Sequence, residues 1–337
     1  MKLGDLATSL RVSLQGDPDY EIRALAPIER ARPDELSFVV GRQFLNQLRE
    51  TQAGAVIIPE SLINDAPSQA LIAEDPYECY ARASWLLDPE RLPPQGVDTL
   101  ASVHPSAQIA NSASIGPFVQ IAANVTIGER VVVDAYCSVG EGSTVSEGTR
   151  LFPRVTIYPG CQLGCDCRVQ SGAVIGSEGF GYAMSKEGWQ GIQQVGGVRI
   201  GNRVHIGANT TIDRGAMDDT VIEDGVILDN QIQIAHNVQI GENTAIAGCV
   251  GIAGSTRIGR HCQIGGACNI VGHLTISDGV ILNAASLVTQ SIDTPGRYSS
   301  GTPLQPSAHW KRTYVSIGKL DELVRRIRRL EKHQEDQ

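Results

Sequence analysis

Residues 101–130 read ASVHPSAQIANSASIGPFVQIAANVTIGER, and every sixth residue from Val103 onward is aliphatic. The pattern holds for thirteen positions to Ile175, resumes at Ile200 and runs to Val288, twenty-eight aliphatic positions in all. A period of six fits neither a helical turn nor the alternation of a strand. It is the hexapeptide period of a parallel β-helix, in which each flat side sends one aliphatic side chain into a prism. The sequence therefore predicts a mainly β fold whose residues stack at intervals of eighteen.

Three regions are expected along the chain. Residues 1–100 do not keep the period; strand-like runs at 37–40, 53–59 and 70–73 alternate with helical stretches at 41–50 and 77–87, which predicts a small α/β domain ending in a proline-rich linker, 88–102. Residues 101–290 form the β-helix. Residues 291–337 form a C-terminal extension, in which prolines exclude a long helix before 307 and a terminal α-helix follows.

Composition indicates a cytoplasmic protein of more than one domain. The 337 residues include 36 glycines and only 5% aromatic residues, which suits a thin solenoid with small corner residues. The N-terminal MKLGDLATSLRVSLQGDPDY has no continuous apolar segment, and no apolar run reaches membrane-spanning length. We expect no export, no stable membrane insertion and no nucleic-acid partner.

The cysteines look at first like a metal site, because Cys161, Cys165 and Cys167 lie close together in the sequence. Their phase favours another interpretation. Five of the eight fall four residues after a repeat aliphatic, a slot that elsewhere holds Ala, Val, Ser or Thr: Cys137, Cys161, Cys167, Cys262 and Cys268. We predict that they are reduced thiols that fill the interior, and we expect no metal.

The terminal helix is expected to be amphipathic and basic. Leu320, Leu323, Ile327 and Leu330 recur at heptad-like spacing, which fits either docking on the same chain or a short bundle with symmetry mates. Prisms with three flat sides commonly form trimers, which favours the bundle. Between Arg297 and Lys332 nine basic residues accompany three acidic ones, although the whole chain carries a net charge of -9. This end alone would attract an acidic partner; a solvated helix face is the alternative.

The repeat also predicts where a site would lie. Steps of eighteen, with the insertions removed, place these residues on one side: Ile175, Ile212, Ile234, Ile252, Ile270 and Val288. Two insertions, at 177–199 and about 214–219, therefore leave the prism at the same corner, as do His236, Gly254 above it and His273 one coil higher. Insertions in a solenoid usually mark its binding face.

The residues at this corner suit acyl transfer. A neutral imidazole at His236 can take a proton from an attacking nucleophile, and a backbone N–H at Gly254 can hold the oxyanion of a tetrahedral intermediate. Asp229 follows Leu228 and belongs to another corner of the same coil. It could orient His236 only across a subunit boundary.

Four motifs resemble one family over nearly the whole chain. They are DNQIQIAHNVQIGENTAIAGCVGIAGS (229–255), GSEGFGY (176–182), IDRGAMDDT (212–220) and YSSGTPLQP (298–306). In them the chain is similar to the UDP-3-O-(3-hydroxyacyl)glucosamine N-acyltransferases of lipid A biosynthesis. The resemblance implies a left-handed β-helix, an exception to the right-handed crossover rule. It also implies a homotrimer with active sites between subunits.

The resemblance further implies the reaction and its residues. His236 would take a proton from the glucosamine 2-amino group as it attacks a (R)-3-hydroxyacyl thioester on acyl carrier protein, giving a UDP-2,3-diacylglucosamine. Gly254 would donate to the oxyanion, and His273 would lie near the donor's phosphopantetheine or the intermediate. No cofactor is implied, since the carrier protein bears the phosphopantetheine. Carrier protein is acidic, which matches the basic tail and in particular Arg325, Arg326, Arg328 and Arg329.

The N-terminal domain would help to hold the uridine. The family pattern is Phe-x-x-Asn-x-x-Tyr, and this chain has Phe38, Gly41 and Phe44 at those positions. Both rings can stack on uracil, but Gly41 lacks the amide and Phe44 lacks the hydroxyl. Backbone groups or water would replace those hydrogen bonds, and Phe38 as a core residue of a strand is the alternative.

Two other classes of function stay open on the residues alone. A coenzyme A-dependent acyltransferase acting on another nucleotide sugar would have the same prism and base, and differs in needing no basic tail. A non-catalytic β-helix would need regular decoration along one side, whereas this chain has irregular insertions at one corner. A carbonic anhydrase of this fold would need three converging histidines, and the sequence has no His-x4-His pair.

Overall fold

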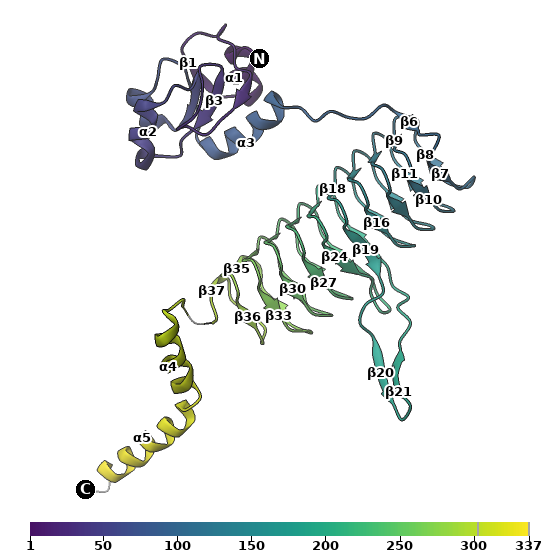
Figure 1. Ribbon diagram of the computed structural model, residues 1–337, viewed down its shortest axis with the longest axis vertical. Coiled ribbons are helices and arrows are strands. Elements are labelled where there is room, and N and C mark those ends of the chain that lie inside the picture. Colours follow the sequence, from purple (N-terminus) through teal and green to yellow (C-terminus); the bar gives the residue numbers. More distant parts are fainter. Residues whose placement is uncertain (302, 336–337) are drawn as a thin grey trace. The chain divides into compact units, whose positions relative to one another are not determined.

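The computed structural model describes residues 1–301 and 303–335, and the chain divides into two compact units, Met1–Leu92 and Pro93–Gln337 (Figure 1). The first unit has a five-stranded sheet in the order β1 (Ser13–Gln15), β5 (Ala70–Ile72), β4 (Ala55–Ile58), β3 (Glu35–Phe38), β2 (Ala24–Leu25). Only β1 is antiparallel to its neighbour. Around the sheet lie α1 (Leu3–Leu10), α2 (Leu45–Glu50), α3 (Pro76–Leu87) and two 3-10 helices, η1 (Arg42–Phe44) and η2 (Glu60–Asp65).

Both faces of this sheet are covered. Ile57 packs in one cluster with residues of α1 and α3, while Val56 and Ile58 pack in another with Leu48 of α2. Burial on both faces explains why β4 is a continuous apolar run. The predicted α/β domain is confirmed; α1, β1 and β2 were not foreseen, because they are short and carry no distinctive period.

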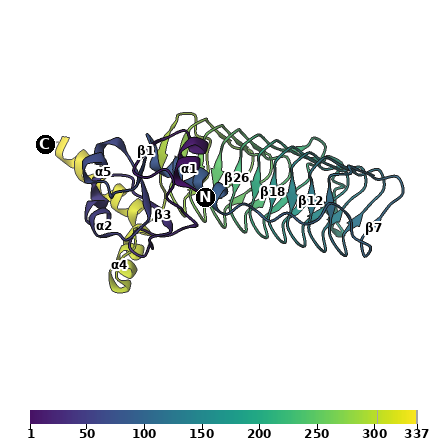
Figure 2. The ribbon, with the colours of Figure 1, turned by 90° about the horizontal axis from the view of Figure 1, so that it is seen from above.

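The second unit contains the predicted prism, built from three parallel sheets that we call the first, second and third faces (Figures 1 and 2). The first face comprises β7 (Ser102–Val103), β10 (Gln120–Ile121), β13 (Ser138–Val139), β16 (Thr156–Ile157), β19 (Val174–Ser177), β24 (Thr211–Asp213), β27 (Gln233–Ile234), β30 (Gly251–Ile252), β33 (Asn269–Ile270) and β36 (Leu287–Val288). The second comprises β8 (Gln108–Ile109), β11 (Thr126–Ile127), β14 (Thr144–Val145), β17 (Gln162–Leu163), β22 (Val198–Ile200), β25 (Thr220–Ile222), β28 (Gln239–Ile240), β31 (Arg257–Ile258) and β34 (Thr275–Ile276).

The third face is extended at both ends beyond the predicted repeats. It comprises β6 (Gly96–Val97), β9 (Ser114–Ile115), β12 (Val132–Val133), β15 (Arg150–Leu151), β18 (Arg168–Val169), β23 (His205–Ile206), β26 (Ile227–Leu228), β29 (Ala245–Ile246), β32 (Gln263–Ile264), β35 (Val280–Leu282) and β37 (Gly296–Tyr298). The added strands are β6, from within the expected linker, and β37. Val97 of β6 lies one repeat before Val103 and pairs with Ile115, eighteen residues on, so the period begins one strand earlier than predicted. In β37 Tyr298 pairs with Leu282 only sixteen residues away, out of phase with the repeat.

The register follows the sequence period. Ile157 pairs with Ile175, and across the first insertion Ile175 pairs with Ile212 and Ile212 with Ile234. The third residue after most repeat aliphatics has positive φ, including Asn237 at 59°. Asn and Gly adopt this conformation most readily, which explains their frequency at the corners.

The interior of the prism is apolar, with its few polar groups paired. The five cysteines in the repeat phase are buried, as predicted. Burial raises the pKa of the Cys137 and Cys161 thiols to about 11, so both are protonated at neutral pH. Hydroxyls in the same slot donate to backbone carbonyls of the coil, as from Thr149 to Gly164 at 2.8 Å. In the described ranges 1–301 and 303–335, no group of three or more His, Cys, Asp or Glu side chains could hold a metal ion.

The C-terminal extension forms two helices rather than one, α4 (Ser307–Ile317) and α5 (Leu320–Glu335). The break falls at Gly318, a residue of low helix propensity. The five apolar residues of the α5 stripe are all exposed: Leu320, Leu323, Val324, Ile327 and Leu330. Among the helices of residues 1–301 and 303–335, none is long and apolar enough to span a membrane.

Candidate active site

The imidazole of His236 lies against the backbone of Gly254. His236 is two residues beyond the end of β27, and Gly254 is two residues beyond the end of β30, the paired strand of the next coil. A Cβ added at Gly254 would lie 2.6 Å from Nε2 and 2.7 Å from Cε1 of His236. These distances are shorter than van der Waals contact, so only glycine leaves the ring this position. The stacking predicted from the period of eighteen is confirmed.

The hydrogen bonds of Asn237 fix the tautomer of His236. Asn237 Oδ1 accepts from the Ala216 backbone N–H at 2.9 Å, and its Nδ2 donates to the Asp218 carbonyl at 2.9 Å. The amide is thereby oriented with its oxygen toward His236 Nδ1, 3.0 Å away. Because an amide oxygen only accepts hydrogen bonds, Nδ1 carries the proton and Nε2 presents a lone pair. The Nε2 lone pair of His236, the atom that a general base would use, therefore lies on the side of Gly254.

The two insertions pack against each other beside His236 and form what we call the wall of the site. The first leaves β19 and forms a hairpin of β20 (Tyr182–Ser185) and β21 (Gly188–Gly191), which projects from the prism (Figure 1). Its return segment bonds to the second insertion, with Val195 N–H donating to Ala216 at 2.9 Å and Gly196 N–H to Gly215 at 3.0 Å. Gly179 lies close enough to His236 that an added Cβ would be 2.7 Å from the histidine Cβ. The common origin of both insertions, predicted from the repeat, is confirmed.

A carboxylate accompanies the base. Asp213, at the end of β24, accepts from Ser177 Oγ at 2.8 Å and from Gln233 Nε2 at 2.9 Å. Burial raises the pKa of the Asp213 carboxyl, while these hydrogen bonds and the charge of His236 lower it. A proton accepted by His236 would therefore be stabilised by Asp213.

The other two polar candidates differ in their distance from the base. The backbone N–H of His273 donates to the Gly254 carbonyl at 3.0 Å, which places His273 one coil beyond the glycine, and its side chain is exposed. Asp229 lies at the end of β26 on the third face, where Oδ2 accepts from the Gly248 N–H at 3.0 Å. Within residues 1–301 and 303–335 no hydrogen bond or ion pair joins Asp229 to His236. The structure brings together His236, Gly254 and His273, and leaves Asp229 at another corner, as the repeat predicts.

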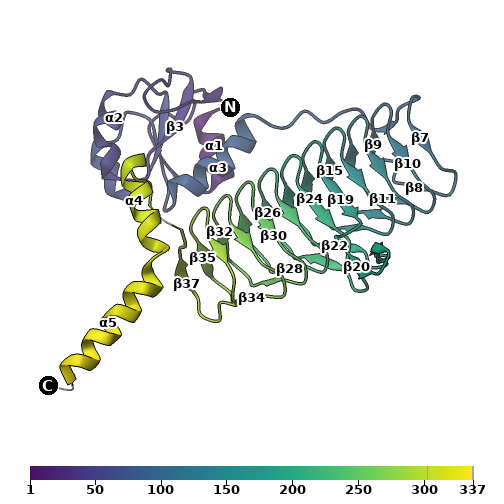
Figure 3. The same ribbon diagram turned by 60° about the horizontal axis from the view of Figure 1, so that its bottom comes forward.

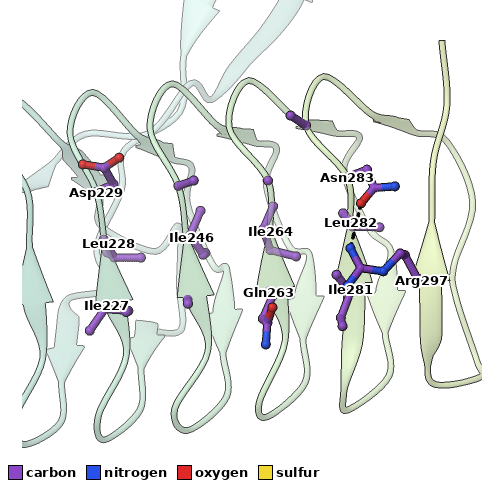
Figure 4. Close-up of a pocket in the computed structure, with 14 residues that line it drawn as sticks. Ile227, Leu228, Asp229, Ile246, Gln263, Ile264, Ile281, Leu282, Asn283 and Arg297 are labelled. Carbon is purple, nitrogen blue, oxygen red and sulfur yellow. Dashed lines mark hydrogen bonds between the residues drawn. The ribbon is translucent and has the colours of Figure 1, made fainter. Parts of the chain in front are cut away.

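Asp229 instead lines a groove of about 590 Å³ on the third face (Figure 4). Successive strands contribute Ile227, Ala245, Gln263 and Ile281 to it, so the groove is mostly apolar with one amide in the row. At one end Arg297 donates from Nη1 to Asn283 Oδ1 at 3.1 Å, drawn as a dashed line in Figure 4. The groove could accept an extended apolar chain, but His236 does not line it.

Comparison with known proteins identifies the family. The family model for UDP-3-O-(3-hydroxymyristoyl) glucosamine N-acyltransferase, LpxD, matches residues 19–86, and the bacterial transferase hexapeptide model matches 106–141 and 219–254. The UDP-3-O-acylglucosamine N-acyltransferase of Pseudomonas syringae pv. tomato is 46% identical over 98% of this chain and 95% of its own. That of Pseudomonas aeruginosa strain UCBPP-PA14 is 47% identical over 98% and 94%. The chain belongs to the UDP-3-O-acylglucosamine N-acyltransferase family.

A solved structure agrees with the fold of this N-acyltransferase family member. The crystal structure of UDP-N-acetylglucosamine O-acyltransferase (LpxA) from Moraxella catarrhalis RH4 superposes with a TM-score of 0.50 and 25% identity, over 68% of this chain and 83% of the other. The prism is thus a left-handed parallel β-helix, as the resemblance implied.

In this N-acyltransferase the two aromatic residues expected at the uridine pack against other side chains of their own domain. Phe38 ends β3, and its ring stacks on Tyr80 of α3 with centroids 4.3 Å apart. Phe44 ends η1 and packs partly buried against the second cluster of the domain. Gly41 has an extended backbone with φ 169°, and an added Cβ would meet only the Gln43 side chain. The backbone at Gly41 therefore does not require glycine.

The basic residues predicted to contact a carrier protein all lie on α5. Arg325, Arg326, Arg328 and Arg329 are exposed. Arg325 pairs with Asp321 at 2.7 Å, one turn earlier. Four residues that the structure brings to His236 or Asp213 were not predicted from the sequence as parts of the site: Ser177, Asp213, Gln233 and Asn237.

Proposed function

We propose that the protein transfers a (R)-3-hydroxyacyl chain from acyl carrier protein to the 2-amino group of UDP-3-O-(3-hydroxyacyl)-α-D-glucosamine. The product is a UDP-2,3-diacylglucosamine, a step of lipid A biosynthesis. The observation that carries the proposal is the Nε2 lone pair of His236, held by Asn237 and facing Gly254, in a chain of this family. The curated relatives bear the same acceptor and reaction in their names.

The reaction follows from this geometry. The amine nitrogen attacks the thioester carbonyl carbon while Nε2 of His236 removes one N–H proton. The carbonyl oxygen gains negative charge, which the Gly254 N–H stabilises; within the described ranges that N–H donates to no other acceptor. The C–S bond then breaks, and the thiolate of the carrier's phosphopantetheine leaves and takes the proton from His236. The amide bond forms as the thioester is lost, so neither an oxidant nor a covalent enzyme intermediate is needed.

We assign no cofactor and no metal to the protein in this reaction, because the acyl group arrives already activated as a thioester. His273, which is bonded through its backbone to Gly254, lies where the phosphopantetheine would approach the base. Phe38, Gly41 and Phe44 are proposed to contact the uracil, with the two rings providing stacking and the extended backbone at Gly41 providing hydrogen bonds.

The basic α5 supports acyl carrier protein as the donor. Its four arginines lie in a chain that is otherwise strongly acidic, so an acidic carrier would approach this end. Coenzyme A is also anionic but small, and it would not need a basic surface that runs along a whole helix.

A homotrimer is proposed on two observations. The α5 stripe exposes five apolar residues, and a stripe of that kind buries itself against other helices. The apolar groove of the third face and the base of the first face lie at different corners of one chain, so a neighbouring copy would bring a groove to each base. In that arrangement Asp229 of one subunit could reach His236 of the next.

Eight unpaired thiols support a reducing, cytoplasmic location.

Mass spectrometry of the product tests the proposal. Purified protein is incubated with UDP-3-O-(3-hydroxyacyl)glucosamine and a set of 3-hydroxyacyl carrier proteins, and the expected product gains one 3-hydroxyacyl group on nitrogen. His236→Ala should fold and assemble as the wild type does but lose at least about a hundredfold in turnover. If none of the carrier-protein donors gives product, the proposed function is wrong. If His236→Ala keeps the wild-type turnover, His236 is not the general base.

A further inference from the structure

A buried amide next to the base has an unused hydrogen-bond acceptor. Gln194, on the return segment of the first insertion, is only 6% exposed. Its Nε2 donates to the Ile192 carbonyl at 3.1 Å, but in the described part of the chain its Oε1 has no hydrogen-bond partner. A buried acceptor without a partner destabilises a fold, so such a group at an active site calls for a functional reason.

The unpaired oxygen and the imidazole share the space beside one glycine. A Cβ added at Gly179 would lie 3.2 Å from Gln194 Oε1 and 3.2 Å from His236 Cδ2. Because Gly179 has no side chain, nothing on that residue separates the amide oxygen from the edge of the ring. Gly181 makes room for the other end of the amide, since a Cβ there would lie 2.5 Å from Gln194 Nε2.

The position of Gln194 is fixed before any reaction. The next two residues, Val195 and Gly196, donate backbone hydrogen bonds to the second insertion, which also holds Asn237. The side-chain carbonyl of Gln194 is therefore attached to the same pair of insertions that orients Asn237 and, through it, sets the tautomer of His236. A fixed dipole near a developing charge stabilises that charge without reorganisation, and most strongly where water is excluded.

We propose that Gln194 is a positioning residue whose Oε1 stabilises the protonated imidazole of His236 while it holds the proton of the attacking amine. This deepens the proposed function and rests on it, because it assumes that His236 is the base. The neutral imidazole gains less from the dipole than the imidazolium does, so Gln194 makes the base stronger. The unpaired Oε1 lowers the stability of the fold, and in return it is free to stabilise the imidazolium during proton transfer.

Other charged and titratable groups also surround this corner. They are Asp213 from β24, Glu178 from the first insertion, Arg214 and Asp218 from the second, and His273 one coil on. All of them stay unchanged in the variants below, so they contribute equally to each.

The test compares Gln194→Met with Gln193→Met, the same substitution at the exposed neighbouring residue. Diethyl pyrocarbonate reacts with a histidine only when its imidazole is neutral. Mass spectrometry of the peptide that contains His236 therefore gives the labelling rate of this residue as a function of pH, and no enzymatic activity is required. We expect the labelling midpoint of Gln194→Met to fall by about half a unit to one unit, a three- to tenfold change in the protonation equilibrium. Gln193→Met should keep the wild-type midpoint, and turnover should fall about tenfold only in Gln194→Met.

Stability separates this role from a structural one. Gln194→Met removes the buried acceptor that has no partner, but it also removes the hydrogen bond from Nε2 to the Ile192 carbonyl. The two effects on stability oppose each other, so Gln194→Met should melt close to the wild-type temperature. Gln194→Leu serves as a second variant if Gln194→Met does not fold. An unchanged labelling midpoint in a folded Gln194 variant overturns the inference even if the enzyme proves to be an N-acyltransferase. A shifted midpoint in a protein that makes no product overturns the proposed function instead.

Discussion

Nε2 of His236 and the α-carbon of Gly254 are so close that no Cβ fits between them, since one would lie 2.6 Å from the nitrogen. The three nearest atoms to that added Cβ all belong to the imidazole, and Gly254 has no positive φ. The position of the imidazole is therefore what requires glycine at residue 254. This relationship makes Gly254 a probe of the active site that leaves the fold intact.

Gly254→Ala should consequently separate activity from stability. The added methyl group displaces the imidazole, and a misplacement of about 1 Å can lower turnover about a hundredfold. We expect a melting temperature close to that of the wild type and a loss of kcat of that size, measured by thermal denaturation and product formation.

Gly251→Ala is the matched control. Gly251 lies on β30, the strand that precedes Gly254, and its Cβ would meet only the end of the Asn269 side chain, at 3.2 Å. In a His236→Ala background Gly254→Ala should not lower turnover further, because the effect of the added methyl group acts through the imidazole. Wild-type turnover by Gly254→Ala would show that the imidazole does not work from this position.

Asn237 offers a second probe, through the tautomer that it imposes. Asn237→Ala removes the acceptor at Nδ1 and allows the proton to move to Nε2, where it blocks the base. We expect kcat to fall about ten- to a hundredfold, as for other losses of general-base function.

Asn237→Asp distinguishes this effect from simple loss of packing. A carboxylate retains an acceptor for Nδ1 and adds a negative charge, which favours the protonated ring. The acid limb of kcat/KM should therefore move to higher pH by about one unit, while Asn237→Ala leaves no such shift. Equal pH profiles for wild type and Asn237→Asp would contradict the hydrogen bond.

The sequence alone could predict the framework of this site but not its supporting groups. Ile175, Ile212 and Ile234 carry the period, so counting by eighteen was enough to place Gly254 above His236 and to gather both insertions at one corner. Inside an insertion there is no period to count. Gln194 and its two glycines depend on how irregular backbone packs against the prism, and Asp213 depends on a strand that extends one residue beyond its repeat aliphatic.

Other differences have similar causes. Gly318 divides the expected terminal helix because tertiary packing does not compensate there for a poor helix former. Phe38 stacks on Tyr80, a contact across forty-two residues of a domain without repeats. Local pattern predicts elements in such a domain, but it does not predict which side chains meet.

Asp213 provides a test in which stability and activity move in opposite directions. Burial raises the pKa of this carboxyl, so the unfolded state loses its proton first, near pH 4. Below that pH the two states are equally protonated; as pH rises through the folded pKa, ionising the half-buried carboxyl destabilises the fold. Asp213→Asn removes this cost while keeping polar partners for Ser177 and Gln233.

The melting temperature of Asp213→Asn relative to wild type should therefore increase between about pH 4 and pH 7, by about 2–4 °C for each kcal/mol relieved. Turnover should fall about tenfold at neutral pH, because the charge that stabilises a protonated His236 is gone. The measurements are thermal denaturation of both proteins across that range and kcat at pH 7. A variant less stable than wild type at pH 7, with unchanged kcat, would show that Asp213 serves the fold and not the base.

The last prediction concerns the donor and the basic helix α5. Changing Arg325, Arg326, Arg328 and Arg329 together to Gln removes four positive charges from an exposed surface. We expect the KM for acyl carrier protein to rise about tenfold, with kcat at saturating donor unchanged, because the charges attract the carrier and lie outside the chemistry. Added salt should raise the wild-type KM, since the Debye length falls to about 10 Å at 0.1 M, and should affect the variant little.

Changing the same four residues to Lys is the control, since it keeps the charge and should keep the wild-type KM. Arg325 is already paired with Asp321 at 2.7 Å, so Arg326, Arg328 and Arg329 should account for most of the effect. A short acyl-pantetheine donor, which carries no acidic protein, should be used equally by all three proteins. If the Gln variant loses as much activity with that donor as with the carrier protein, the arginines act on assembly or folding of the C-terminal helices and not on recognition of the carrier.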